Sequence, residues 1–145
     1  MKSLTYFTYN ERPGSGLHRT QVEDFISELS CSSEAQICLV DFIQPHIYVN
    51  SRAQIREIKV RLNGYGVDYR VIPLALPERH INNTLAIFVS TIVNVLLFAL
   101  LVRPTEYTHC RGYFSTLVAT LSRRIRKTKV IFDPRSQYPE ENIVA

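Results

Sequence analysis

The sequence predicts an α/β fold, a Rossmann-like open parallel sheet with helices on both faces. Short segments rich in β-branched and aromatic residues alternate with segments whose apolar residues recur every three or four positions. This alternation is typical of βαβ units and a parallel sheet. The chain has 145 residues, of which 46% are hydrophobic and 21% charged, as in a globular protein with one core. We therefore expect a single domain over residues 1–145.

The N-terminal third predicts a strand, a loop and a helix. The first strand is expected at Leu4–Tyr9, and the loop 10–16 that follows contains two glycines and a proline. Thr20 and Glu23 have the spacing of a capping box, and the apolar residues after them predict a helix that packs on the sheet: Val22, Phe25, Ile26 and Leu29. The N-terminus lacks the long apolar run and small-residue cleavage site of a signal peptide.

Two more strands and one more helix are expected before residue 77. A buried strand is predicted at Ile37–Ile43, an apolar run that only Asp41 interrupts. Residues 51–54 again have capping-box spacing, and they open a helix whose apolar stripe ends at the Asn-Gly pair 63–64. A third strand is predicted within Asp68–Leu76, centred on Val71 and Ile72, with Pro73 and Pro77 ending it.

Residues 84–102 contain no charged side chain, and this uncharged segment is long enough to span a membrane. The segment contains polar residues such as Asn94, and Arg79 and Arg103 flank it closely. Both neighbouring segments resemble Rossmann strands, which could not pair with one another across a bilayer. A buried or interfacial helix is therefore favoured, and a spanning helix stays open as the alternative.

Polar residues gather after the last two predicted strands. A brief fourth strand is expected at residues 107–109, then a helix with an apolar face and a basic C-terminal end, then a strand at Val130–Phe132 buried on both faces. With the sheet order 3-2-1-4-5, the residues that follow these strands share one rim of the sheet. Ligands bind at that rim in open α/β sheets. The residues are His109, Arg111, Asp133 and Arg135.

The order of these motifs resembles the N-terminal domain of family-4-type glycosyltransferases, which have the GT-B fold. The resemblance rests on His109-Cys-Arg-Gly112 after the fourth strand, and on Phe132-Asp-Pro-Arg135-Ser and Tyr138-Pro-Glu-Glu141 after the fifth. Gly14-Ser-Gly16 also lies where this family has a glycine loop. Ser136 stands where the family usually has glycine, and Tyr138 where tryptophan is frequent.

The resemblance implies the acceptor-side half of an enzyme that transfers a sugar from a nucleotide-sugar donor to a sugar or lipid-linked acceptor. It implies retaining chemistry with no metal and no cofactor besides the donor. Asp133 and His109 would be the catalytic residues, because a carboxylate can act as a base and an imidazole can donate to a sugar oxygen. The substrate-binding residues would be Gly14, Ser15, Gly16, Arg111 and Arg135.

Other interpretations stay open beside this one. The chain ends soon after the fifth strand, so we expect a truncated enzyme that lacks its C-terminal domain and is inactive alone. A nucleotide-binding or regulatory Rossmann-like module without transferase activity is the first alternative. Gly14, Gly16 and Asp41 would suit a dinucleotide site, although Arg19 occupies the third glycine position. A small membrane-anchored interaction protein that uses residues 84–102 is the second. For Asp133 and Arg135, a structural ion pair competes with a functional role.

Charge and cysteine usage suggest partners and location. Much of the formal net charge of +4 comes from residues 123–129. These residues form either a solvated helix end or a patch that attracts anionic membrane lipids or phosphorylated substrates. A nucleic-acid partner is not expected. Three cysteines without a Cys-x-x-Cys pair favour the cytoplasm, with a peripheral position on the inner face of the membrane open. We predict surface positions and no metal site for the scattered histidines, His18, His46 and His80.

Overall fold

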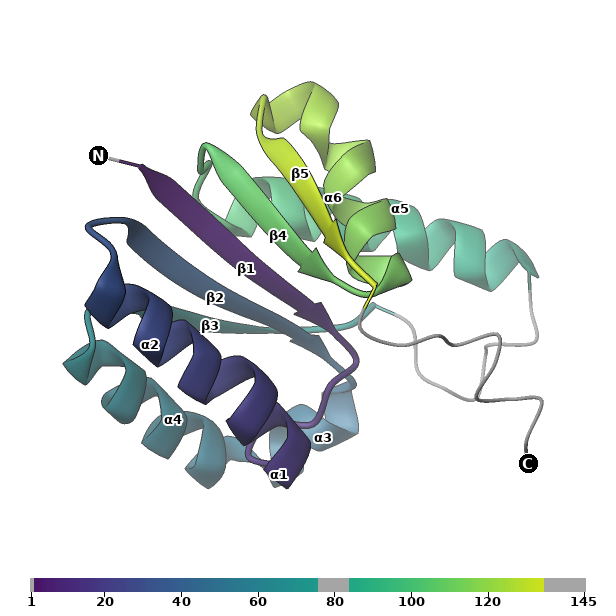
Figure 1. The fold of residues 1–145 in the computed structure, drawn as a ribbon. Helices are drawn as coiled ribbons and strands as arrows, with labels where there is room; N and C mark the ends of the chain where they lie inside the picture. Colours follow the sequence, from purple (N-terminus) through teal and green to yellow (C-terminus); the bar gives the residue numbers. More distant parts are fainter. Residues whose placement is uncertain (1, 76–83, 135–145) are drawn as a thin grey trace.

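A computed structural model describes residues 2–75 and 84–134 and shows a five-stranded parallel sheet between two helical layers (Figure 1). The strand order is β3-β2-β1-β4-β5, which confirms the predicted fold class and order. Every pair of neighbouring strands is parallel. The strands are β1 (Ser3–Tyr9), β2 (Gln36–Ile43), β3 (Asp68–Pro73), β4 (Tyr107–Arg111) and β5 (Lys129–Asp133).

One helical layer covers β1, β2 and β3. It consists of α1 (Gly16–His18), the π-helical turn η1 (Arg19–Glu23), α2 (Asp24–Ser32) and α4 (Arg52–Gly64). Val22 and Ile26 pack against Tyr6 and Leu39 of the sheet, as the apolar spacing predicts. The prediction of a capping box is wrong for both helices. The first helix begins earlier, at the N-cap Ser15, and the Ser51 side chain makes no capping bond to α4.

The short helix α3 (Pro45–Asn50) lies where only the end of a strand was expected. Pro45 is its first residue, a position that suits proline because the missing N–H would have no partner inside the helix. Four of the five strands also run beyond their predicted ends, whereas β3 stops at Pro73. Consequently His109 lies in the middle of β4 rather than at its end, Arg111 lies within β4 rather than in the loop after it, and Asp133 is the last residue of β5.

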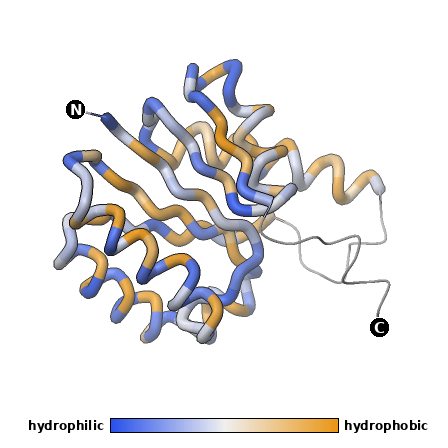
Figure 2. The backbone as a smooth tube through the Cα atoms, in the orientation of Figure 1, coloured by the Kyte–Doolittle hydropathy of each residue, from blue (hydrophilic) through white to orange (hydrophobic). Residues whose placement is uncertain are grey.

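The other helical layer consists of α5 (Thr84–Leu101) and α6 (Tyr113–Arg126). Its core contains Phe98 of α5, whose ring packs on Phe7 of β1 at a centroid distance of 4.5 Å. Asn94 joins α5 to the sheet, because its amide nitrogen donates to the Tyr9 hydroxyl at 3.1 Å and its oxygen accepts from the Ala75 N–H. Figure 2 shows that α5 is apolar along most of its length. By length and composition alone, α5 is the one described helix that could cross a membrane.

The prediction that β5 is buried on both faces is wrong. Ile131 and Phe132 are 44% and 41% exposed, because β5 is an edge strand with one neighbour, and no helix of the described chain lies over the α2 side that carries Ile131. The apolar residues that share one face of α6 are mostly exposed as well; Val118 is the member of that set that is buried. Of the cysteines, Cys31 is exposed, whereas burial raises the pKa of Cys38 and of Cys110 to about 12.

Candidate functional site

The carboxyl ends of β1 and β4 form the topological switch point of the sheet. These parallel strands are neighbours, but the chain leaves β1 toward α1 and α2 on one face and leaves β4 toward α6 on the other (Figure 1). The two connections diverge, and in open α/β sheets ligands bind outside the strand ends at such a switch point. The predicted residues Gly14, Ser15, Gly16 and Arg111 lie at this end of the sheet.

The loop after β1 has an ordered geometry. Asn10 has a positive φ of 60° and donates its N–H to the Phe42 carbonyl at 2.6 Å. Gly14 has a φ of 74°, which suits glycine, and the Ser15 hydroxyl accepts a hydrogen bond from the His18 N–H at 3.2 Å. A Cβ at Gly16 would meet no atom within 4 Å, so the chain there borders open space. Gly14 and Ser15 therefore serve the loop itself, and Gly16 leaves room beside it.

Arg111 joins this loop to β4. Its side chain is 8% exposed, its Nε lies 2.8 Å from Oε1 of Glu11, and its Nη2 donates to the side-chain oxygen of Gln21. The remaining nitrogen, Nη1, is buried and has no hydrogen-bond partner among the described residues. A buried guanidinium N–H without an acceptor is unfavourable, so this group is suited to an anion brought by a ligand.

The N-terminus of α6 follows Arg111 directly. Gly112 is its N-cap, with a φ of 89°, and no side chain of the described residues caps the helix. The hydroxyl groups of Ser115 and Thr116 donate backward to the carbonyls of Arg111 and Gly112, so they do not accept from the first N–H groups. Those N–H groups have no partner within the helix and carry the positive end of its dipole. Together with Arg111, they form an environment for a phosphate or another anion.

The two residues predicted to be catalytic are close together, on the α2 side of the sheet. Nε2 of His109 lies 3.3 Å from Oδ2 of Asp133, and the two side chains are 20% and 19% exposed. The His109 ring also packs on Tyr6, with 4.8 Å between the ring centroids. Arg135, the other half of the ion pair predicted with Asp133, lies outside the described residues.

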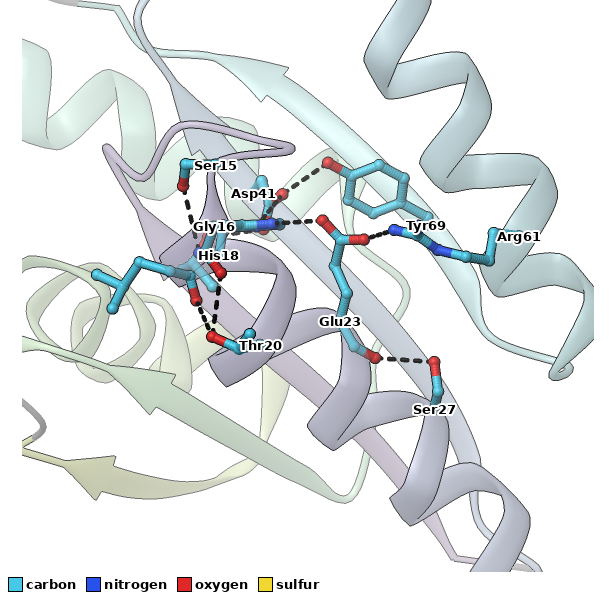
Figure 3. Close-up of polar contacts among 11 residues, drawn as sticks. Ser15, Gly16, His18, Thr20, Glu23, Ser27, Asp41, Arg61 and Tyr69 are labelled. Atoms are coloured by element: carbon cyan, nitrogen blue, oxygen red, sulfur yellow. Dashed lines mark hydrogen bonds and ion pairs between the residues drawn. The ribbon is translucent and has the colours of Figure 1, made fainter.

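A buried ionic network lies beneath the loop after β1, and the sequence did not predict it (Figure 3). His18 is 1% exposed rather than on the surface, with Nδ1 at 2.9 Å from Glu23 Oε1 and Nε2 at 3.0 Å from Asp41 Oδ2. Arg61 of α4 contacts the other oxygen of Glu23. Asp41 also accepts from the hydroxyls of Thr8, at 2.6 Å, and Tyr69, at 2.7 Å.

One signal for this network was present in the sequence. Asp41 interrupts an otherwise apolar strand, and a carboxylate in a buried strand requires partners. Sequence spacing alone did not identify His18 and Glu23 as these partners. Because three donors already occupy Asp41, it is not available to bind a ribose as a dinucleotide site would require. Within the described ranges, no group of three or more His, Cys, Asp or Glu side chains has a metal-binding arrangement.

Burial and charge act against each other in this network. Burial lowers the pKa of His18, but the charge and hydrogen bond of Asp41 outweigh burial, so the pKa of His18 is raised. Burial raises the pKa of Asp41, but the charge of His18 and the hydrogen bonds from His18, Thr8 and Tyr69 outweigh it, so that pKa is lowered. The carboxylates beside His18 therefore favour its imidazolium form, and Asp41 stays ionised to a lower pH than a solvent-exposed aspartate.

We expect the free energy of unfolding to decline as the pH rises above neutrality. The contribution of His18 is fully present below its unfolded pKa of about 6.5 and is lost as the pH rises through its higher folded pKa. The contribution of Asp41 is present above its unfolded pKa of about 3.9 and is lost as the pH falls through its lower folded pKa. Urea unfolding at a series of pH values measures both, and His18→Gln should remove the decline on the alkaline side. A flat wild-type profile from about pH 6 to 9 would contradict this account.

The chain was compared with protein families, curated proteins and solved structures. No family model and no curated protein matches the chain. Among solved structures, the chain is similar to a universal stress protein in complex with cAMP, with a TM-score of 0.44 and 16% sequence identity. The match covers 92% of this chain and 98% of the other.

This finding corrects the glycosyltransferase interpretation. The comparisons give no glycosyltransferase evidence and contradict the expected GT-B family, sugar transfer and enzyme class. The sugar partners expected with them, a nucleotide-sugar and a sugar or lipid-linked acceptor, are contradicted too, and the comparisons give no support to the expected C-terminal domain or anionic membrane. The physical reason is that a parallel α/β sheet places polar and glycine residues after its strands in many unrelated proteins, so the order of such motifs does not specify one family.

Proposed function

We propose that this protein is a nucleotide-binding or regulatory Rossmann-like module without transferase activity, and that it holds the phosphate of its ligand at the switch point. One observation carries the proposal. Arg111 is buried at the carboxyl end of β4 with Nη1 unpartnered among the described residues, directly before the uncapped N-terminus of the 14-residue helix α6. Two independent sources of positive potential therefore meet at the rim where this fold binds ligands.

Each predicted site residue that the structure describes has a role in this proposal. Arg111 donates to the phosphate from Nη1 while Glu11 and Gln21 hold its other nitrogens in place. Gly112, with no side chain and a left-handed backbone, lets the phosphate approach the first N–H groups of α6. Gly14, Ser15 and Gly16 form the opposite wall, where the loop after β1 ends.

His109 and Asp133 are proposed to contact the hydroxyl groups of the ligand. Both are partly exposed, and Asp133 is paired with Arg111 in the register of β4 and β5. A carboxylate accepts hydrogen bonds from a sugar hydroxyl, and an imidazole can donate to one. These contacts would hold the ligand without chemistry on it.

The test is the affinity of the full chain for a set of ligands measured by calorimetry. The set includes inorganic phosphate, AMP, ATP, cAMP and adenosine, which lacks the phosphate. We expect phosphate-bearing nucleotides to bind more tightly than adenosine. Arg111→Gln should weaken them by roughly 10- to 100-fold, because hydrogen bonds to charged groups are worth about 1.5–3 kcal/mol.

Arg124→Gln is the matched control, because it removes the same charge from an exposed position of α6. It should leave these affinities nearly unchanged. Thermal melts of both variants establish that they are folded. The proposal is wrong if adenosine binds as tightly as AMP, if no nucleotide binds, or if Arg111→Gln and Arg124→Gln have equal effects.

A further inference from the structure

The helix α5 carries its polar side chains inward and its apolar side chains outward. Ser90, Asn94 and Phe98 are the buried residues of this helix, and they form one narrow stripe against the sheet. The opposite side exposes large apolar residues, including Phe88 at 63%, Ile92 at 45% and Leu96 at 47%. A helix on a protein surface usually has the reverse arrangement, with its apolar stripe toward the core.

The helix α6 likewise buries small and polar side chains and exposes large apolar ones. Its buried residues include Ser115, Ala119, Ser122 and Arg126, and the two serine hydroxyls donate to carbonyls of the preceding turn. Leu117, Leu121 and Ile125 recur every four residues along another side of the helix and are 44%, 49% and 65% exposed. Burial of the sheet-facing stripe therefore leaves the apolar stripe of α6 uncovered by the described chain.

The two apolar stripes belong to one face of the molecule. α5 and α6 lie on the same side of the sheet, and Arg126 of α6 donates to the carbonyls of Phe98 and Val102 near the end of α5, both at 2.6 Å (Figure 1). We call the exposed apolar side chains of both helices the α5–α6 face; Phe88, Ile92, Leu96, Leu117, Leu121 and Ile125 represent it.

The size of the α5–α6 face can be compared with what a dimer requires. Large apolar side chains that are more than one third exposed number nine on α5 and five on α6, fourteen in all. If a partner covered about half of the surface of each of these side chains, the apolar area buried would be on the order of 600–800 Å². A standard interface buries about 800 Å² per partner, whereas a soluble monomer rarely exposes more than a few hundred Å² in one apolar patch.

We propose that the α5–α6 face is the contact between two copies of this chain. Homodimer contacts are more apolar than other protein surfaces and are depleted of charge at their centre, as this face is over the uncharged length of α5. The basic residues Arg103, Arg123, Arg124 and Lys127 collect at one end of the two helices. A twofold axis across α5 would place the helices antiparallel and separate the two basic ends by up to about 27 Å, the length of an 18-residue helix.

A membrane surface fits these observations less well than a second copy. A helix that lies in a membrane interface carries basic residues along the flanks of its apolar face, whereas α5 carries none over 18 residues. A spanning α5 would have to give up the Asn94 bonds to Tyr9 and Ala75 and the Phe98 contact with Phe7.

The test is the molar mass of the full chain by sedimentation equilibrium over a range of concentrations, without and with neutral or anionic lipid vesicles. We expect twice the chain mass of 16.7 kDa in the absence of lipid. The double variant Leu96→Glu with Leu121→Glu should raise the dimer dissociation constant by about 30-fold or more, the effect of losing central apolar contacts. The control Val60→Glu, which places the same charge at a 70% exposed position on α4, should leave it unchanged.

Thiol labelling keeps the test independent of how well the charged variants fold. In a Cys31→Ser background the remaining thiols, Cys38 and Cys110, are buried with pKa values raised to about 12, so they react slowly. Labelling of Leu96→Cys should slow as the protein concentration rises, whereas labelling of Val60→Cys should not. A monomer at all concentrations, a dimer in which Leu96→Cys is not protected, or a monomer that associates only with vesicles would overturn the proposal.

Discussion

Asp41→Asn is expected to lower the free energy of unfolding by about 3–5 kcal/mol, the effect of removing one partner from a buried ion pair. The carboxylate of Asp41 is fully buried and accepts from Thr8, His18 and Tyr69. An asparagine of the same shape replaces one acceptor oxygen by an NH₂ group, which would face donors on either side of the carboxylate. It also leaves the His18 imidazolium with less compensating charge. The loss is a large share of the 5–15 kcal/mol typical of a folded domain.

Asp68→Asn is the control for this experiment. Asp68 makes a 2.9 Å ion pair with Arg70 at the surface, where the two side chains are 47% and 36% exposed. The same chemical change there should reduce the free energy of unfolding by no more than about 1 kcal/mol. Urea unfolding of both variants at a slightly acidic pH gives the comparison. Similar small losses at Asp41 and Asp68 would mean that the buried network contributes little to stability.

The second large effect is expected for Arg126→Met, which should lower the free energy of unfolding by about 2–4 kcal/mol, because it removes the side-chain donor to the Val102 and Arg103 carbonyls and one of two donors to the Phe98 carbonyl. Arg126 is 7% exposed and donates to the carbonyls of Phe98, Val102 and Arg103 at the C-terminal end of α5. Its guanidinium also lies 4.7 Å from the centre of the Phe98 ring. The end of α5 presents partial negative charge, so this arginine both satisfies the last carbonyls and stabilises the helix dipole.

Arg124→Met provides the comparison, because Arg124 is exposed two residues earlier on the same helix. It should change stability by less than about 0.5 kcal/mol. Hydrogen exchange adds a local measurement: Arg126→Met should speed exchange of the Val102 amide, which donates to the Phe98 carbonyl, and Arg124→Met should not. Equal stability of the two variants would show that α5 does not need this cap.

The sheet could be predicted because its information is local. Apolar runs, helical spacing and the turn residues between them give the elements, and the rules for parallel connections give the order 3-2-1-4-5. The ends of strands were less predictable. Arg111 and Asp133 are polar, which suggested loops, but strands near the end of a sheet continue through polar residues when their backbone groups still pair, as Arg111 and Asp133 do.

Burial was predicted less well, because periodicity indicates that a helix has an apolar side but not which side is covered. In α6 the apolar stripe with Leu117 and Leu121 is exposed, and small and polar residues such as Ser122 are buried instead. The prediction for His18 was wrong in the opposite direction, because it was expected at the surface and is buried. A single histidine in a polar segment has no apolar neighbours to suggest burial, and its partner Asp41 is 23 residues away in the sequence.

The anchoring of the loop after β1 lowers the entropy cost of binding a ligand beside it. The loop is tied to β2 by Asn10, to β4 by the pair of Glu11 with Arg111, and to the sheet by the His18 network. A loop held at these points has already lost most of its conformational entropy on folding, so a ligand does not have to supply that free energy when it binds. The loop side of the switch point is thus preorganised, and the affinity of a ligand there depends mainly on its own contacts and on the water that it displaces.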